Sequence, residues 1–174
     1  MIVLVMGGTR SGKSEVAEQV AQRFDAPVTF VAIAGPADAE MRRRVEEHRA
    51  RRPAAWRTTE CEDEGIDLVD AVARTDGTVL IDSLGTWVAR APDMHVDSAG
   101  LVKALRGRSG STVVVSEEVG LAVHAPTDAG RRFTDAMGLL NATVAAVADR
   151  VFLVVAGRAV PLHAVGDVLG VEGP

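Results

Sequence analysis

IVLVMGGTRSGKS, from Ile2 to Ser14, joins a five-residue apolar run to a G-x-x-x-x-G-K-S motif. In this context the motif predicts a phosphate-binding loop between a buried strand and an amphipathic helix. Its glycines let backbone N–H groups form a concave nest, and the helix N-terminus adds partial positive charge. We expect Lys13 to reach the β- and γ-phosphates of a nucleoside triphosphate, and the Ser14 hydroxyl to bind Mg²⁺. The residues expected to contact the nucleotide are Gly7, Gly8, Thr9, Arg10, Ser11, Gly12, Lys13 and Ser14.

The overall composition is that of one folded domain spanning residues 1–174. Hydrophobic residues make up 47% and charged residues 25%, which is typical of a globular protein. The one cysteine, Cys61, excludes an internal disulfide and suits a reducing compartment, so we expect a cytoplasmic protein in which Cys61 is an inert small side chain. No apolar stretch approaches the ~18 residues of a membrane span. The net charge of −5 argues against nonspecific nucleic-acid binding.

Strand and helix patterns alternate along the chain. We predict strands at Ile2–Met6, Pro27–Ala32, Thr78–Ile81 and Thr112–Val115, and a hairpin of Val151–Val155 with Ala159–Leu162. We predict helices at Gly12–Phe24, Asp38–Arg51, Ile66–Ala73, Ser83–Arg90, Ser98–Arg106 and Gly130–Ala148, with a loop at Ala91–Asp97 and a loose tail after Gly166. The fold class is therefore α/β: a mainly parallel sheet of the phosphate-loop NTPase type, with helices on both faces and an antiparallel hairpin at the C-terminal edge.

A carboxylate follows the strand at Thr78–Ile81. Because the carboxyl ends of parallel strands gather ligands, we expect Asp82 to lie on a strand beside the phosphate-loop strand, near the Mg²⁺ bound by Ser14. Ser14 and Asp82 are the predicted metal ligands.

The predicted helix Asp38–Arg51 is rich in arginine and contains His48. One interpretation is a solvated helix whose charges pair with each other. Another is that the arginines neutralise polyphosphate while neutral His48 acts as nucleophile or base. Nucleic-acid binding is a third interpretation, but aromatic residues are 3% of the chain and none interleaves with these arginines.

The remaining histidines have weaker settings. We interpret His95 and His163 as structural or surface residues, because neither lies in a basic stretch. His124 competes with His48, since it lies in the loop after the fourth predicted strand. Trp56 and Trp87 are interpreted as packing residues.

Beyond the phosphate loop, a set of motifs is spread in order over nearly the whole chain. The most specific are H-R-x-x-R-P-x-x-W-R-T-x-E, from His48 to Glu60, and E-V-G, from Glu118 to Gly120. The others are Glu40-Met41, Asp82-Ser83-Leu84, Trp87, Ser116, Pro126, Gly130–Phe133, Asn141, Ala148-Asp149 and Val154–Gly157. Together these residues resemble the family of bifunctional adenosylcobinamide kinases and adenosylcobinamide-phosphate guanylyltransferases of cobalamin biosynthesis.

The resemblance implies two reactions on one substrate. Such enzymes phosphorylate the aminopropanol hydroxyl of adenosylcobinamide with ATP or GTP. They then transfer GMP from GTP through a covalent histidine, which gives adenosylcobinamide-GDP and pyrophosphate. By resemblance that histidine is His48, Glu60 belongs to guanosine binding, and Arg49 and Arg52 contact the nucleotide. The resemblance also implies a homotrimer.

Two departures from the family pattern stand out. Glu117 occupies a position where the family often has Asn, and the segment between Trp87 and Thr112 is short. Two other functions stay open. One is a simple small-molecule kinase that uses only the phosphate loop and Asp82. The other is a nucleotide-dependent switch whose arginine-rich helix binds a partner.

Overall fold

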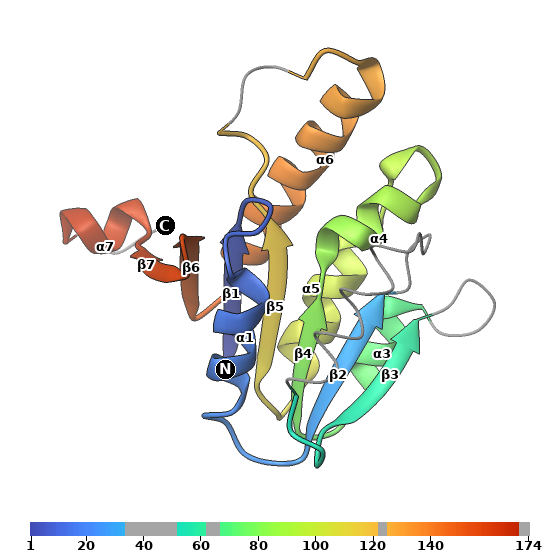
Figure 1. Ribbon diagram of the computed structural model, residues 1–174, viewed down its shortest axis with the longest axis vertical. Coiled ribbons are helices and arrows are strands. Elements are labelled where there is room, and N and C mark those ends of the chain that lie inside the picture. The colour runs from blue at the N-terminus through green and yellow to red at the C-terminus, as the bar shows by residue number, and fades with distance from the viewer. Residues whose placement is uncertain (34–51, 62–66, 122–124, 171–174) are drawn as a thin grey trace.

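The computed structural model describes residues 1–33, 52–61, 67–121 and 125–170. A seven-stranded sheet in the order β3-β2-β4-β5-β1-β6-β7 runs through the molecule (Figure 1). Its strands are β1 (Ile2–Gly7), β2 (Val28–Ile33), β3 (Arg57–Cys61), β4 (Thr78–Asp82), β5 (Thr112–Glu117), β6 (Arg150–Val155) and β7 (Arg158–Leu162). The helical elements are α1 (Lys13–Ala21), α3 (Leu68–Arg74), α4 (Leu84–Arg90), η1 (Pro92–Met94), α5 (Ser98–Gly107), α6 (Asp128–Ala145) and α7 (Val165–Leu169).

The central strands are apolar on both faces because helices cover both. Adjacent strands from β3 to β6 are parallel, and only β7 runs antiparallel to its neighbour. Val3 and Val5 of β1 pack with Ala17 of α1, whereas Leu4 belongs to the cluster formed with α3, α4, α5 and α6. Alternate side chains of one strand therefore enter two cores, as expected for a doubly covered parallel sheet.

The C-terminal hairpin differs from the rest of the sheet. Its turn at Ala156 and Gly157 has positive φ at both residues, 50° and 73°, which is the backbone of a tight turn that matches the strand twist. All of β7 is exposed, and α7 follows it. The expectation of a loose tail after Gly166 is therefore wrong for its first residues, Asp167–Leu169, which belong to the short helix α7.

The predicted fold class and the hairpin are confirmed, and the described predicted elements lie within a few residues of their expected positions. The sequence interpretation missed three elements: edge strand β3, the short helix η1 inside the expected loop at Ala91–Asp97, and α7. Strand β3 has mostly exposed side chains, so it lacks the apolar run by which strands were identified. The predicted helix Asp38–Arg51 lies outside the described residues.

Strand order requires one further correction. Asp82 was expected on a strand beside β1, but β5 lies between β1 and β4. Each of these strands is reached through a crossover, and a helical crossover can return to either side of an existing strand. The sequence therefore identifies the strands without fixing their order.

The amino ends of the central strands are joined by a partly buried arginine. The Arg108 guanidinium donates hydrogen bonds to Thr112 Oγ1 at 3.0 Å, Val72 O at 2.7 Å and Gly77 O at 2.5 Å, and also to Thr75 O. It thereby connects the end of α3 to the starts of β4 and β5. Its role is to satisfy backbone carbonyls that the helix and the turn leave open.

Candidate nucleotide-binding site

The phosphate loop, Gly7–Ser14, connects β1 to α1 at the carboxyl ends of the parallel strands. Arg10 and Gly12 have positive φ angles of 57° and 91°, which turn the backbone tightly before the helix begins. The Ser11 Oγ is buried and has no hydrogen-bond partner within the described part of the chain. A buried hydroxyl without a partner is costly, so this atom is consistent with a site completed by a ligand.

The C-terminal hairpin supports this loop from the side. Gly157 N donates a 2.7 Å hydrogen bond to Ser11 O, and a Cβ at Gly12 would lie 3.1 Å from Gly157 Cα. Two glycines thus allow a close backbone approach between segments at opposite ends of the chain. Sequence analysis did not identify this role of Gly157, since nothing local connects the turn to the loop.

Lys13 points toward the end of β5. Its Nζ donates to Gly8 O at 3.3 Å and lies 3.7 Å from Glu117 Oε1. Only 12% of the Lys13 side chain is exposed. The amine is therefore held close to the loop by one weak hydrogen bond and one ion pair, both of which a phosphate could replace.

Glu117 is tightly held, although the sequence interpretation treated it only as a departure from a family pattern. Ser83 Oγ donates to its Oε1 at 2.7 Å, and Gly85 N donates to its Oε2 at 2.8 Å. Glycine at position 85 leaves room for this carboxylate, because a Cβ there would lie 2.1 Å from Glu117 Oε2. Asn141 Nδ2 also donates to the Glu117 backbone carbonyl at 2.9 Å. Ser83, Gly85 and Asn141 are thus further site residues that sequence reasoning left without a role.

Asp82 lies at the end of β4 and interacts with Ser14. Part of its side chain remains accessible, but the surrounding protein desolvates it strongly and raises its pKa to about 6; the Glu117 charge adds to this rise. A hydrogen bond with the Ser14 side chain, together with Lys13 and Arg52, opposes the rise. A hydroxyl and a carboxylate in contact supply two hard oxygen ligands, which fits the preference of Mg²⁺ for a few protein oxygens plus phosphate and water.

No larger metal-ligand cluster competes with this pair: within the described ranges, no group of three or more His, Cys, Asp or Glu side chains could hold a metal ion. The fold brings the predicted metal ligands Ser14 and Asp82 within hydrogen-bond distance of each other.

The other predicted nucleotide contacts lie along the same sheet edge. Arg52 Cζ lies 3.4 Å from the centroid of the Phe30 ring, so its guanidinium stacks on an aromatic face. Glu60 is part of β3 and pairs in register with Ala32, which pairs on its other side with Asp82. Glu60 and Asp82 thus occupy the same level of the sheet. His48, Arg49 and His124 lie outside the described residues.

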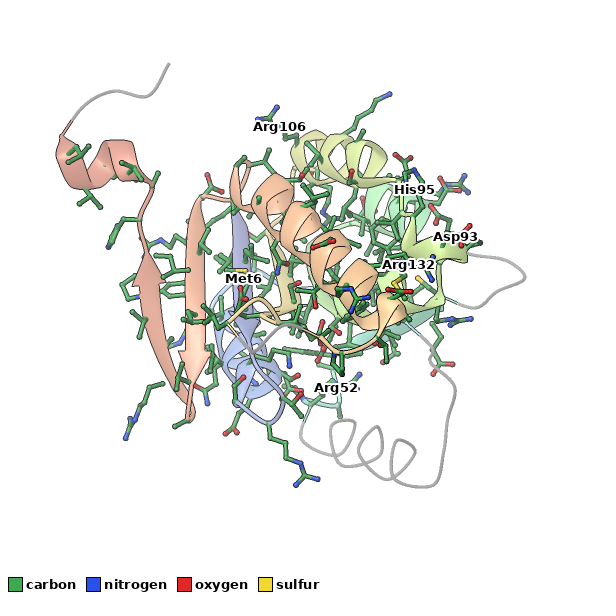
Figure 2. The ribbon with its side chains drawn as sticks, turned by 90° about the horizontal axis from the view of Figure 1, so that it is seen from above. Met6, Arg52, Asp93, His95, Arg106 and Arg132 are labelled. Carbon is green, nitrogen blue, oxygen red and sulfur yellow. The ribbon has the colours of Figure 1, made fainter. Side chains whose placement is uncertain are left out.

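Figure 2 looks down on the edge where the parallel strands end, with Arg52 labelled beside it. His95 lies on the far side of the molecule from the β6–β7 hairpin, and both His95 and His163 are exposed, as expected of surface residues.

Trp56 and Trp87 pack against the two cores. Cys61 is buried, and this burial raises the pKa of its thiol, which suits the expected inert role.

The sheet, the phosphate loop and the carboxylate at the end of β4 together define the class of protein. A mainly parallel sheet with a phosphate loop after β1 and a carboxylate at the end of β4 is a P-loop NTPase fold. The chain resembles the solved structure of a prototypical ATPase from the type III secretion system of pathogenic bacteria, with a TM-score of 0.55 and 14% identity, over 87% of this chain and 50% of that one. It also resembles a protein from Pyrococcus horikoshii, with a TM-score of 0.53 and 10% identity, over 96% and 88% of the two chains. These likenesses concern the fold alone.

The family follows from the sequence match. The model of the family described as cobinamide kinase / cobinamide phosphate guanyltransferase matches residues 3–162, so the chain belongs to this family, whose members are transferases. The bifunctional adenosylcobalamin biosynthesis protein CobP of Pseudomonas aeruginosa is 36% identical, over 91% of this chain and 95% of that protein. The corresponding CobU protein of Salmonella typhimurium is 33% identical, over 93% and 99%. Among the described residues, no helix is long and apolar enough to cross a membrane.

Proposed function

We propose that this chain phosphorylates adenosylcobinamide with ATP or GTP and then transfers GMP from GTP to the new phosphate, giving adenosylcobinamide-GDP and pyrophosphate. Both reactions would belong to one domain, residues 1–174, in the cytoplasm where nucleoside triphosphates are abundant. Family membership supports the pair of activities. The observation that carries the nucleotide chemistry is the convergence of Lys13, Ser14 and Asp82 at the end of the parallel strands.

In the kinase step, backbone N–H groups of the phosphate loop and the Lys13 amine would bind the β- and γ-phosphates. Ser14 and Asp82 would hold Mg²⁺, which supplies neutralising charge when bound. The substrate hydroxyl would attack the γ-phosphorus, forming a new P–O bond and releasing its proton while the bond between the γ-phosphorus and the β-phosphate oxygen breaks. The chain's contribution is to orient the phosphates and to stabilise their charge.

In the guanylyl step, a neutral His48 nitrogen would attack the α-phosphorus of GTP. A P–N bond forms, the bond to the β-phosphate oxygen breaks, and pyrophosphate leaves; the imidazole loses a proton in the process. A phosphate oxygen of adenosylcobinamide phosphate would then attack the same phosphorus and release His48. We assign Arg49 and Arg52 to the nucleotide phosphates and Glu60 to guanosine. The position of Arg52 at the strand ends supports this assignment.

The test uses GTP labelled on the α-phosphate, incubated with the purified protein and Mg²⁺ and followed by a denaturing gel. We expect the wild type to retain acid-labile, base-stable label, and His48→Ala to retain none. His95→Ala is the matched control, because it removes an exposed histidine, and it should label like the wild type. Phosphoryl transfer to adenosylcobinamide without protein label would favour a simple kinase. GTP hydrolysis indifferent to the corrinoid would favour a nucleotide-dependent switch.

We further propose that the protein is a homo-oligomer, and a trimer by resemblance to its family. Exposed apolar side chains concentrated on the hairpin and the helix after it support an interface there: Val155, Val160, Leu162, Val165, Val168 and Leu169. Light scattering after size exclusion should give a multiple of the 18.3 kDa chain for the wild type and a smaller species for Leu162→Asp. Leu139→Asp, at an exposed leucine on α6, is the control and should leave the mass unchanged. A monomeric wild type would contradict the proposal.

A further inference from the structure

The carboxylate of Glu117 occupies an unusual place for a negative charge, because it lies beside an anion-binding loop. Strand β5 neighbours β1, and Glu117 is in register with Gly7, the residue at which the phosphate loop begins. Its side chain is 24% exposed, and its Oε1 lies 3.7 Å from Lys13 Nζ. The charge that should attract phosphate is thus already paired with an acid of the same chain.

This carboxylate is fixed rather than able to swing aside. Ser83 Oγ and Gly85 N each donate to one of its oxygens, and the missing Cβ of Gly85 makes room for it. Its backbone is held as well: the Glu118 amide donates to Gly7 O at 3.2 Å, and Asn141 Nδ2 donates to Glu117 O at 2.9 Å. When a phosphate arrives, the mobile partner of the ion pair is therefore the lysine, and the negative charge of Glu117 stays where it is.

A second carboxylate lies close by. The negative charge of Glu117 repels the Asp82 carboxylate at the end of β4 and contributes to the raised pKa of Asp82. A polyphosphate entering the loop would therefore meet two acids, beside the Arg52 guanidinium and a lysine that is partly neutralised. Such a site binds a bare polyphosphate less tightly than one that enters with a cation.

We infer that Glu117 is a specificity-determining residue: its fixed carboxylate holds Lys13 in the nucleotide-free protein and makes the phosphate loop select cation-bound nucleotides over free nucleotides and free pyrophosphate. Ser14 and Asp82 are the residues that would hold the accompanying Mg²⁺. This inference rests on the nucleotide site of the proposed function and is independent of the guanylyl-histidine.

The test is a calorimetric titration of the full protein with a non-hydrolysable GTP analogue, once with Mg²⁺ and once with EDTA. Glu117→Gln keeps the side-chain shape and removes the charge. We expect it to tighten binding in EDTA by at least about tenfold and to change binding with Mg²⁺ much less, so that the ratio of the two dissociation constants falls by about tenfold. Free pyrophosphate in EDTA should bind more tightly in the same proportion.

Glu118→Gln is the matched control. Glu118 is the adjacent acid, and its Oε1 accepts from Gly120 N at 2.7 Å within its own turn. The Glu118→Gln variant changes the net charge by the same amount. The ratio should stay within about twofold of the wild-type value, because the Glu118 carboxylate accepts from Gly120 N whereas Lys13 pairs with Glu117. Glu117→Asn is a second variant that removes the charge, in case the glutamine variant does not fold. Gly85→Ala displaces the carboxylate without removing it, and it should lower the ratio in the same direction.

An unchanged ratio in both charge-removing variants would overturn the inference. Equal weakening of binding with and without Mg²⁺ would also overturn it, since that result would make Glu117 a structural support. Selective weakening with Mg²⁺ would make Glu117 a cation ligand instead. A wild-type protein that binds no nucleotide even with Mg²⁺ would contradict the proposed function itself, whereas binding that is equally tight with and without Mg²⁺ contradicts this inference alone.

Discussion

Two shielded cations lie at opposite ends of the same sheet, and they differ in how fully their own chain satisfies them. Arg108, at the amino ends of the strands, donates to a threonine hydroxyl and to three backbone carbonyls. Lys13, at the carboxyl ends, has a 3.3 Å hydrogen bond and an ion pair at 3.7 Å. A cation whose donors are matched within the chain holds the fold together. One that is weakly matched can exchange its partners for a ligand.

The largest effect on activity is expected at the carboxyl ends of the strands, from Lys13→Met. The variant keeps the length and the apolar stem of the side chain but removes the charge that stabilises the phosphates. We expect phosphoryl and guanylyl transfer to fall about 1,000-fold, while the unfolding midpoint stays near that of the wild type. Steady-state assays and thermal unfolding measure the two quantities. Lys103→Met, at an exposed lysine on α5, is the control, and an unstable Lys13→Met would mean that this cation is structural.

Arg108→Met, at the amino ends of the strands, should have the opposite pattern: it should lower stability and leave activity unchanged. Loss of the guanidinium leaves several carbonyl groups without their donor, so the free energy of unfolding should fall by about 4 kcal/mol. Activity per folded molecule should be unchanged, because the site lies at the other end of the strands. Urea unfolding followed by circular dichroism measures the loss. Arg106→Met, on the same helix but exposed, should cost less than about 0.5 kcal/mol. A stable Arg108→Met with altered nucleotide binding would contradict the division between the two ends.

A third prediction concerns how the free energy of unfolding depends on pH through Asp82, and Asp82→Asn tests it. The pKa of Asp82 is about 6 in the folded protein, above its ordinary value of 3.8. The folded state therefore binds more protons than the unfolded state between about pH 4 and 6, and the free energy of unfolding falls as the pH rises through this window. Above it the penalty is complete, at about 2 kcal/mol after allowance for the solvent-accessible part of the side chain.

The Asn variant has no such penalty. In the absence of Mg²⁺ it should be more stable than the wild type by about 2 kcal/mol at pH 7.5 and equally stable near pH 4. Urea titrations across this range measure the difference. Asp135→Asn, at an exposed acid on α6, should follow the wild type at every pH. A constant difference from pH 4 to pH 8 would show that Asp82 is not titrating in this window.

Most of the fold could be predicted from local patterns. The apolar runs of β1 and β5 are buried on both faces, so their composition alone identifies them as central parallel strands. Strand β3 was not predicted, because an edge strand needs little apolar surface. Its exposed polar residues Arg57 and Glu60 give it a sequence typical of a loop. The position of β5 between β1 and β4 was not predicted from the sequence either, since strand order depends on packing across crossovers rather than on any one segment.

Some residues of the candidate site were also predictable from the sequence, and others were not. Lys13 and Ser14 were predictable because the phosphate loop is a continuous motif with fixed spacing. Asp82 was predictable as a residue, though not its distance from β1. Glu117 attracted attention only as a departure from a family pattern, because its partners Ser83 and Gly85 come from a different strand end.

The sequence by itself determined the α/β class, the phosphate loop and the family, because each depends on short-range periodicity or on an ordered set of motifs. Only the tertiary structure decided which charges meet. It sets the Lys13 amine against Glu117, the Asp82 carboxylate against Ser14, and Gly157 against the loop backbone. The physical reason is that electrostatic and hydrogen-bond energies depend on distances of a few ångströms. Those distances arise when strands far apart in the chain are packed side by side to bury their apolar faces.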